Sequence, residues 1–162
     1  SQSKPAIGSA ALPQMDITYT ITNTTGSAGS IWLYALDTDF TGDVTLHASL
    51  DGNASFSNFS LTGGVWGGNS NLEALDFTNQ LISLGPATSS PYSLTGSAPV
   101  NASVNPYALL IGLRLDVEGN ATGTATGDLL VTSVPEPASV LLLGFALLGG
   151  GAAMRRRNRS RA

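Results

Sequence analysis

Ile17-Thr18-Tyr19-Thr20-Ile21-Thr22 is the clearest structural signal in the first 133 residues of this 162-residue chain. Bulky apolar and polar β-branched side chains alternate there with a period of two, which predicts a half-buried β-strand. The next residues, 23–29, are rich in Asn, Thr and Gly, a composition typical of a turn. This region therefore predicts a strand followed by a turn.

Similar stretches of apolar and β-branched residues follow along the chain. Further strands are predicted at 31–36, 44–50, 54–61, 81–84 and 92–95, the last as an edge strand between Pro91 and Pro99. Asp51-Gly52-Asn53 predicts a hairpin turn, and the glycines of 63–68 indicate a loop. Residues 108–117 and 121–134 are interpreted as the closing pair of strands, turned at Glu118-Gly119-Asn120.

Seven to nine short strands favour an all-β fold, an antiparallel β-sandwich with an immunoglobulin-like plan. A parallel α/β fold would need helical periods between the strands, and the sequence shows none. We expect one domain at 15–133, preceded by a flexible segment at 1–14. The chain has no cysteine, so its stability owes nothing to disulfides or thiolate metal sites.

The last 29 residues have a different character. Val134-Pro135-Glu136-Pro137-Ala138-Ser139 leads into an uncharged apolar run at 138–154, and an Arg-rich tail follows at 155–162. As a helix the uncharged run would extend about 26 Å, close to the thickness of a bilayer core. A buried core helix is the alternative, but that usually shows a polar face, and this run is apolar all round. We therefore predict a transmembrane helix with its basic end in the cytoplasm.

The three elements in this order resemble the PEP-CTERM sorting signal of Gram-negative bacteria. The resemblance implies recognition by an exosortase, a membrane-embedded transpeptidase-like protease, and cleavage near the Pro-Glu-Pro motif. It also implies secretion by a bacterium that makes extracellular polysaccharide. The sorting and cleavage residues would be Val134, Pro135, Glu136 and Pro137, and those that orient the helix Arg155, Arg156, Arg157, Arg159 and Arg161. Before cleavage the protein would sit in the inner membrane with its N-terminus in the periplasm, and afterwards at the cell surface or outside the cell.

Charge separates the chain into two regions. Eleven acidic residues precede the apolar run and only Lys4 and Arg114 oppose them, which gives residues 1–137 a formal charge of −9. The five arginines give the tail +5. So acidic a domain argues against nucleic acid as a partner. The chain starts at Ser1 without a hydrophobic leader, and we expect that a cleaved secretion signal has been left out.

Five Asn-x-Ser/Thr triplets precede the tail, at Asn23, Asn53, Asn58, Asn101 and Asn120. Chance alone produces such triplets in a chain rich in Ser, Thr and Asn. Asn53 and Asn120 are the stronger candidates for glycosylation, because each has an acid two residues earlier, as bacterial oligosaccharyltransferases prefer. Both also fall in predicted turns, where a bulky sugar fits.

Catalytic chemistry finds little support. His47 is the only histidine, and no serine lies in a nucleophile-elbow sequence. Asp116 and Glu118 could resemble glycosidase carboxylates, but nothing in the sequence fixes their separation. Asp37, Asp39 and Asp43 could offer oxygen ligands to calcium, although the EF-hand spacing is absent and Asx-turns explain them equally well. We predict no metal, no cofactor and no enzyme.

Three functions remain open. The first is a structural, non-catalytic protein of the cell surface, extracellular matrix or biofilm. The second is a module that binds the cell's own exopolysaccharide, with Trp32, Tyr34 and Trp66 as a sugar-stacking platform; core filling is the other interpretation of these rings. The third is a secreted hydrolase. If the protein self-associates, we expect contact through strand edges or domain surfaces and not through the tail, because few lysines protect the edges.

Overall fold

The computed structural model describes residues 8–119 and 121–135, and these form nine β-strands. The strands are β1 (Gly8–Ser9), β2 (Leu12–Asn23), β3 (Gly29–Phe40), β4 (Val44–Ala54), β5 (Phe59–Gly67), β6 (Gln80–Ala87), β7 (Tyr92–Val100), β8 (Tyr107–Val117) and β9 (Gly123–Pro135). No helix in this part of the chain is long and apolar enough to cross a bilayer, and the helix expected at 138–154 lies outside it.

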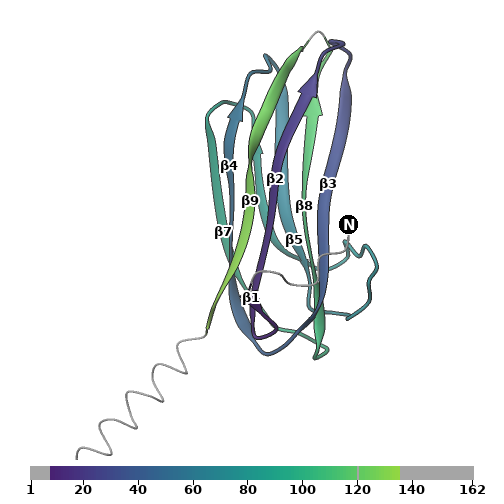
Figure 1. The fold of residues 1–162 in the computed structure, drawn as a ribbon, viewed down its shortest axis with the longest axis vertical. Helices are drawn as coiled ribbons and strands as arrows, with labels where there is room; N and C mark the ends of the chain where they lie inside the picture. Colours follow the sequence, from purple (N-terminus) through teal and green to yellow (C-terminus); the bar gives the residue numbers. More distant parts are fainter. Residues whose placement is uncertain (1–7, 120, 136–162) are drawn as a thin grey trace, which may run out of the picture.

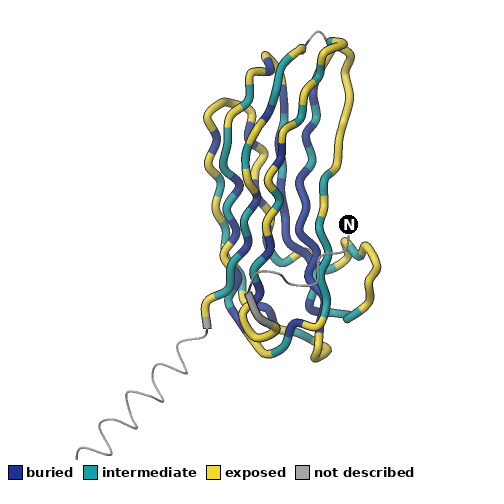
Figure 2. Tube along the Cα trace, viewed as in Figure 1, coloured by how far each residue is buried: buried dark blue, intermediate teal, exposed yellow. Residues whose placement is uncertain are grey.

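The strands make two antiparallel sheets that face each other (Figure 1). One sheet has the order β1-β2-β9-β4-β7 and the other has the order β3-β8-β5-β6. Buried residues of both sheets pack into one hydrophobic core, and Figure 2 marks the buried positions along the strands in dark blue. The predicted antiparallel β-sandwich is therefore confirmed, and the strand Ile17–Thr22 lies within β2.

The immunoglobulin-like plan is wrong. Strands β2 to β5 alternate between the two sheets, β5 and β6 form a hairpin, and β6 to β9 alternate again. This connectivity is that of a jelly roll. The predicted closing pair is wrong for the same reason, because β8 and β9 belong to different sheets. Side-chain alternation tells which residues face inward, but both plans share that pattern, so it cannot tell which sheet a strand joins.

The ends of the sandwich also differ from the expected boundaries. β2 begins at Leu12, and Pro13 is buried, so the fold starts inside the segment 1–14 that was expected to be flexible. β9 ends at Pro135, so the fold also takes in the first two residues of the C-terminal signal. Residues 1–7 and 136–162 lie outside the described part.

Two predicted breaks turn out to be strand. Asp51-Gly52-Asn53 lies inside β4 and the glycines of 63–67 inside β5, so neither is the predicted turn or loop. Gly52 is required by packing: it faces Gly127 of β9, and a Cβ there would collide with the backbone of Thr126 and with the Tyr92 ring. The glycine thus marks a close approach and not a turn.

Two tyrosines meet beneath this pair of glycines. The hydroxyl oxygens of Tyr19 (β2) and Tyr92 (β7) are 2.5 Å apart, and the Tyr92 hydroxyl donates to the carbonyl oxygen of Thr126 at 3.1 Å. A Cβ at Gly127 would lie 2.8 Å from the Tyr19 hydroxyl. The glycines leave room for a side-chain link between β2 and β7, which flank β9 and β4 in the same sheet.

Candidate functional site

The outer face of the four-stranded sheet carries the exposed aromatic side chains. Trp32 and Tyr34 stand two residues apart on β3, an edge strand of this sheet, and are 48% and 51% exposed. In the register across β3, β8 and β5, Trp32 lies beside Arg114 and Thr62, and Tyr34 lies beside Gly112 and Gly64. We call Trp32, Tyr34, Arg114, Asp116 and Phe77 the aromatic face.

Trp66 belongs to the same outer side of the sheet but is covered. The loop 68–79 between β5 and β6 lies over this end of the sheet, and its Phe77 meets Trp66 edge-on with ring centroids 5.2 Å apart. Trp66 is only 9% exposed. Its indole lies above Gly64, where a Cβ would collide with the ring. The predicted platform is therefore divided, with Trp32 and Tyr34 open and Trp66 packed.

Phe77 is the residue of this cluster that sequence reasoning missed. Its ring also meets Trp32, at 6.3 Å between centroids, so it lies between the exposed and the buried tryptophan. Phe77 is itself 44% exposed. The sequence offered no signal for it, because a loop has no period that would show which side chains Phe77 packs against.

Polar groups adjoin the exposed rings. The guanidinium of Arg114 lies 5.3 Å from the Trp32 ring centroid and forms a salt bridge of 2.7 Å with Asp116. The Ser30 hydroxyl donates to the same carboxylate oxygen. The Ser30 hydrogen bond, followed by the Arg114 guanidinium, lowers the pKa of the Asp116 carboxyl, so this group stays ionised.

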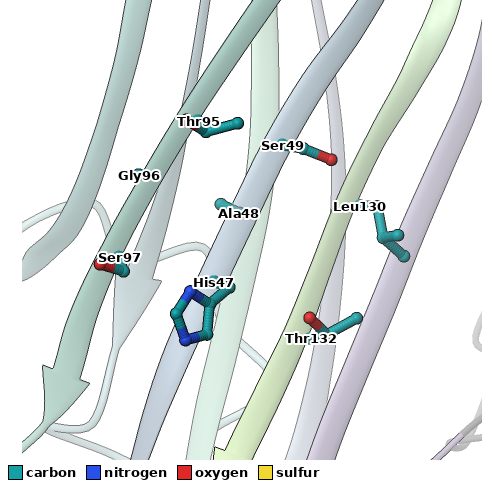
Figure 3. Close-up of a pocket in the computed structure, with 8 residues that line it drawn as sticks. All are labelled: His47, Ala48, Ser49, Thr95, Gly96, Ser97, Leu130 and Thr132. Atoms are coloured by element: carbon teal, nitrogen blue, oxygen red, sulfur yellow. The ribbon is translucent and has the colours of Figure 1, made fainter.

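His47 lies on the opposite side of the molecule, in an open depression of about 410 Å³ on the outer face of β7, β4 and β9 (Figure 3). Ser49, Ser97 and Thr132 supply hydroxyl groups around it. None of the eight lining residues is an acid. The depression therefore does not place His47 in the acid-paired arrangement that a triad needs.

The three candidate calcium ligands do not converge. Within the described residues, no three His, Cys, Asp or Glu side chains lie together as a metal site. Asp39 instead exchanges hydrogen bonds with Asn71, whose amide donates to its carboxylate at 2.9 Å. Asp37 accepts from the Thr38 N–H, and burial raises the pKa of its carboxyl. Asp43 is exposed beyond the end of β3.

The candidate glycosylation sites differ in how free their side chains are. Asn53, Asn58 and Asn101 are exposed. Asn23 is engaged: its amide donates to the carbonyl oxygens of Ser27 and Ala121, and its oxygen accepts from Thr25. Asn120 lies outside the described residues. Asn53 sits in β4 and not in the predicted turn.

The C-terminal end of β9 continues directly into the predicted signal. Ser133, Val134 and Pro135 pair with three β4 residues, Leu46, Thr45 and Val44. The family model of the PEP-CTERM protein-sorting motif matches residues 133–157. This chain carries a PEP-CTERM sorting signal. The predicted resemblance is confirmed, and the motif supports processing by an exosortase.

The PEP-CTERM signal therefore begins inside the folded domain, since its first three matched residues form the end of β9. Leu46 and Val44, opposite Ser133 and Pro135, are core residues. Val134 is 49% exposed on the outward side. The hydroxyl oxygen of Ser133 is buried without a hydrogen-bond partner. In the described chain, no linker separates the sandwich from the start of the signal.

Comparison with curated proteins and solved structures adds little to the PEP-CTERM match. No curated protein matches this chain. Among solved structures, it is similar to the CBM36-1 domain of a multidomain xylanase from the hindgut metagenome of Trinervitermes trinervoides. The identity is 14%, the TM-score is 0.34, and the likeness covers 74% of this chain and 96% of that one. A likeness of this degree says nothing about ligand or activity.

Proposed function

We propose that this protein is exported, processed by an exosortase at its PEP-CTERM signal, and left at the cell surface or in the extracellular matrix as a non-catalytic, structural β-sandwich. The observation that supports it best is the PEP-CTERM match at 133–157, which starts in the last strand of the sandwich. Before cleavage the domain would face the periplasm from an inner-membrane anchor.

Processing would require the end of β9 to detach from β4. A protease that binds its substrate as an extended strand needs the backbone groups that Val134 and its neighbours now pair with β4. The detachment costs little, because Pro135 has no N–H to give to the ladder and Val134 is already half exposed. Ser133 gives up no side-chain hydrogen bond.

Replacing Pro135-Glu136-Pro137 with alanines tests the sorting role. The variant should stay in the inner membrane, whereas the wild-type chain is released to the surface or medium. Fractionation and mass spectrometry of the C-terminus measure both outcomes. Release of the variant at the wild-type level would contradict the proposal.

A disulfide staple tests the detachment step. Thr45 and Val134 are register partners, and the chain has no other cysteine to interfere with a T45C/V134C pair. The oxidised variant should accumulate unprocessed and become processed after reduction. A T22C/T124C staple between β2 and β9, away from the signal, is the matched control and should be processed normally. Normal processing of oxidised T45C/V134C would show that β9 need not open.

Polysaccharide binding is the second candidate function. It is favoured by the exposure of Trp32 and Tyr34 side by side on one sheet face. Retardation of the protein in gels that contain polysaccharide tests this candidate, and unchanged mobility with every polysaccharide would remove it.

A further inference from the structure

We propose that the aromatic face binds a neutral polysaccharide, with pyranose rings stacked on Trp32 and Tyr34. This inference rests on the second candidate function, polysaccharide binding, and gives it a place on the fold and a class of ligand. It does not depend on the sorting role.

The Trp32 and Tyr34 rings are exposed although they do not contribute to the hydrophobic core. Trp32 and Tyr34 are each about half exposed, on an edge strand whose inward residues already serve the core. Large aromatic surfaces left open on a soluble protein usually mark a binding site. A pyranose offers a matching surface, because its axial C–H groups form an apolar face that fits flat against an aromatic ring.

Trp32 is held in place before any ligand arrives. Phe77 packs edge-on against one part of its indole, and the Arg114 guanidinium lies over the ring. Phe77 is supported in turn by the buried Trp66. A ring already fixed loses less conformational entropy on binding, so more of the contact energy appears as affinity.

Hydrogen-bonding groups stand where the hydroxyls of a stacked sugar would reach. Arg114 is the cross-strand neighbour of Trp32, and its side chain is 42% exposed. Asp116 and Ser30 form the adjacent cross-strand pair. The guanidinium can donate and the carboxylate can accept. Apolar rings beside paired donors and acceptors match the amphipathic character of a sugar better than that of a lipid or an apolar helix.

The net charge of the domain favours a neutral polysaccharide as the ligand. Arg114 is the only Lys or Arg among the described residues, and Asp116 neutralises it through the salt bridge. The surrounding domain is acidic, with a formal charge of −9 over residues 1–137. An acidic polysaccharide would be repelled. A neutral glucan, mannan or xylan would meet no such barrier.

The test is affinity electrophoresis of the full chain, with soluble neutral polysaccharides (xyloglucan, galactomannan, arabinoxylan) and acidic ones (alginate, hyaluronate) in the gel. W32A and Y34A should each weaken binding to a neutral polysaccharide at least about tenfold. W32F should retain part of the affinity. L12A removes a side chain that is 42% exposed on the other sheet and should bind normally. Unchanged melting of each variant shows that it is folded.

The outcomes separate the site from the function. Binding to a neutral polysaccharide that W32A and Y34A weaken and L12A does not supports the proposal. Neutral binding that survives both substitutions overturns the site but leaves polysaccharide binding intact. Tighter binding to alginate overturns the charge argument. Absence of all binding removes the candidate function as well. If W32A instead abolishes self-association measured by sedimentation, a second copy of the chain is the occupant and the proposal fails.

Discussion

Removing the Tyr19 hydroxyl and removing the Tyr92 hydroxyl should lower the free energy of unfolding by different amounts. The Tyr92 hydroxyl has one proton and gives it to the carbonyl oxygen of Thr126. The bond of 2.5 Å between the two tyrosines must therefore be donated by Tyr19. The chain of bonds runs from Tyr19 through Tyr92 to β9, and its two members are not equivalent.

The size of each effect follows from what is left unpaired. Y19F removes the first donor but leaves the Tyr92 proton on Thr126, so we expect a loss of about 1 kcal/mol. Y92F also removes the acceptor of Tyr19 and leaves a buried hydroxyl without a partner, so we expect about 2–3 kcal/mol. The double variant lacks that unpaired hydroxyl, so it should be more stable than Y92F alone.

Urea unfolding of the four proteins, followed by fluorescence, gives the double-mutant cycle directly. Y34F is the matched control: its ring is 51% exposed, and the change should stay within about 0.5 kcal/mol. A loss from Y19F equal to or larger than that from Y92F would refute the proton order. Simple additivity of the two losses would refute the coupling.

The remaining predictions concern pH, packing and metal. Burial raises the pKa of Tyr19 above its ordinary value, whereas a tyrosine of the unfolded chain titrates at about 10, so this contribution to stability is complete below that pH and falls above it. Thermal melts should show the loss at high pH, and Y19F should make the melting temperature fall less steeply with pH. G127A should cost about 3 kcal/mol, because the new Cβ would collide with the backbone of β4, whereas G119A, with open space around it, should cost little in the same melts. A chelator should leave the melting midpoint unchanged, because the acids of segment 37–43 do not converge; a drop of many degrees would reveal a calcium site.

The sequence predicts well what is encoded locally. The period of two in Ile17–Thr22 is a property of neighbouring residues, and it gives the buried and exposed sides of β2 correctly at Tyr19 and Thr20. The PEP-CTERM signal is likewise a linear pattern, so its residues could be identified without a structure.

The failures concern contacts between residues distant in the chain. Gly52 and Gly64 look like turn and loop signals, since glycine is common there. In the fold Gly52 makes room for Tyr92 and for the backbone of Thr126, and Gly64 makes room for the Gln80 side chain of β6 as well as for Trp66 of its own strand. Nothing local distinguishes a glycine required by a distant neighbour from one required by a turn. The jelly-roll connectivity was missed for the same reason, because it depends on which strands pair.

Trp32 and Trp66 show how far the site itself could be predicted. Both tryptophans belong to the outer side of the same sheet, and the sequence could not tell that the loop 68–79 covers one and leaves the other open. The topology also places the start of the PEP-CTERM signal and the aromatic face on different sheets. β9 leads into the sorting signal from the five-stranded sheet, whereas the aromatic face lies on the outer side of the four-stranded sheet (Figure 1). The processing that we propose would therefore change no residue of the aromatic face, and any polysaccharide binding should be equal before and after cleavage.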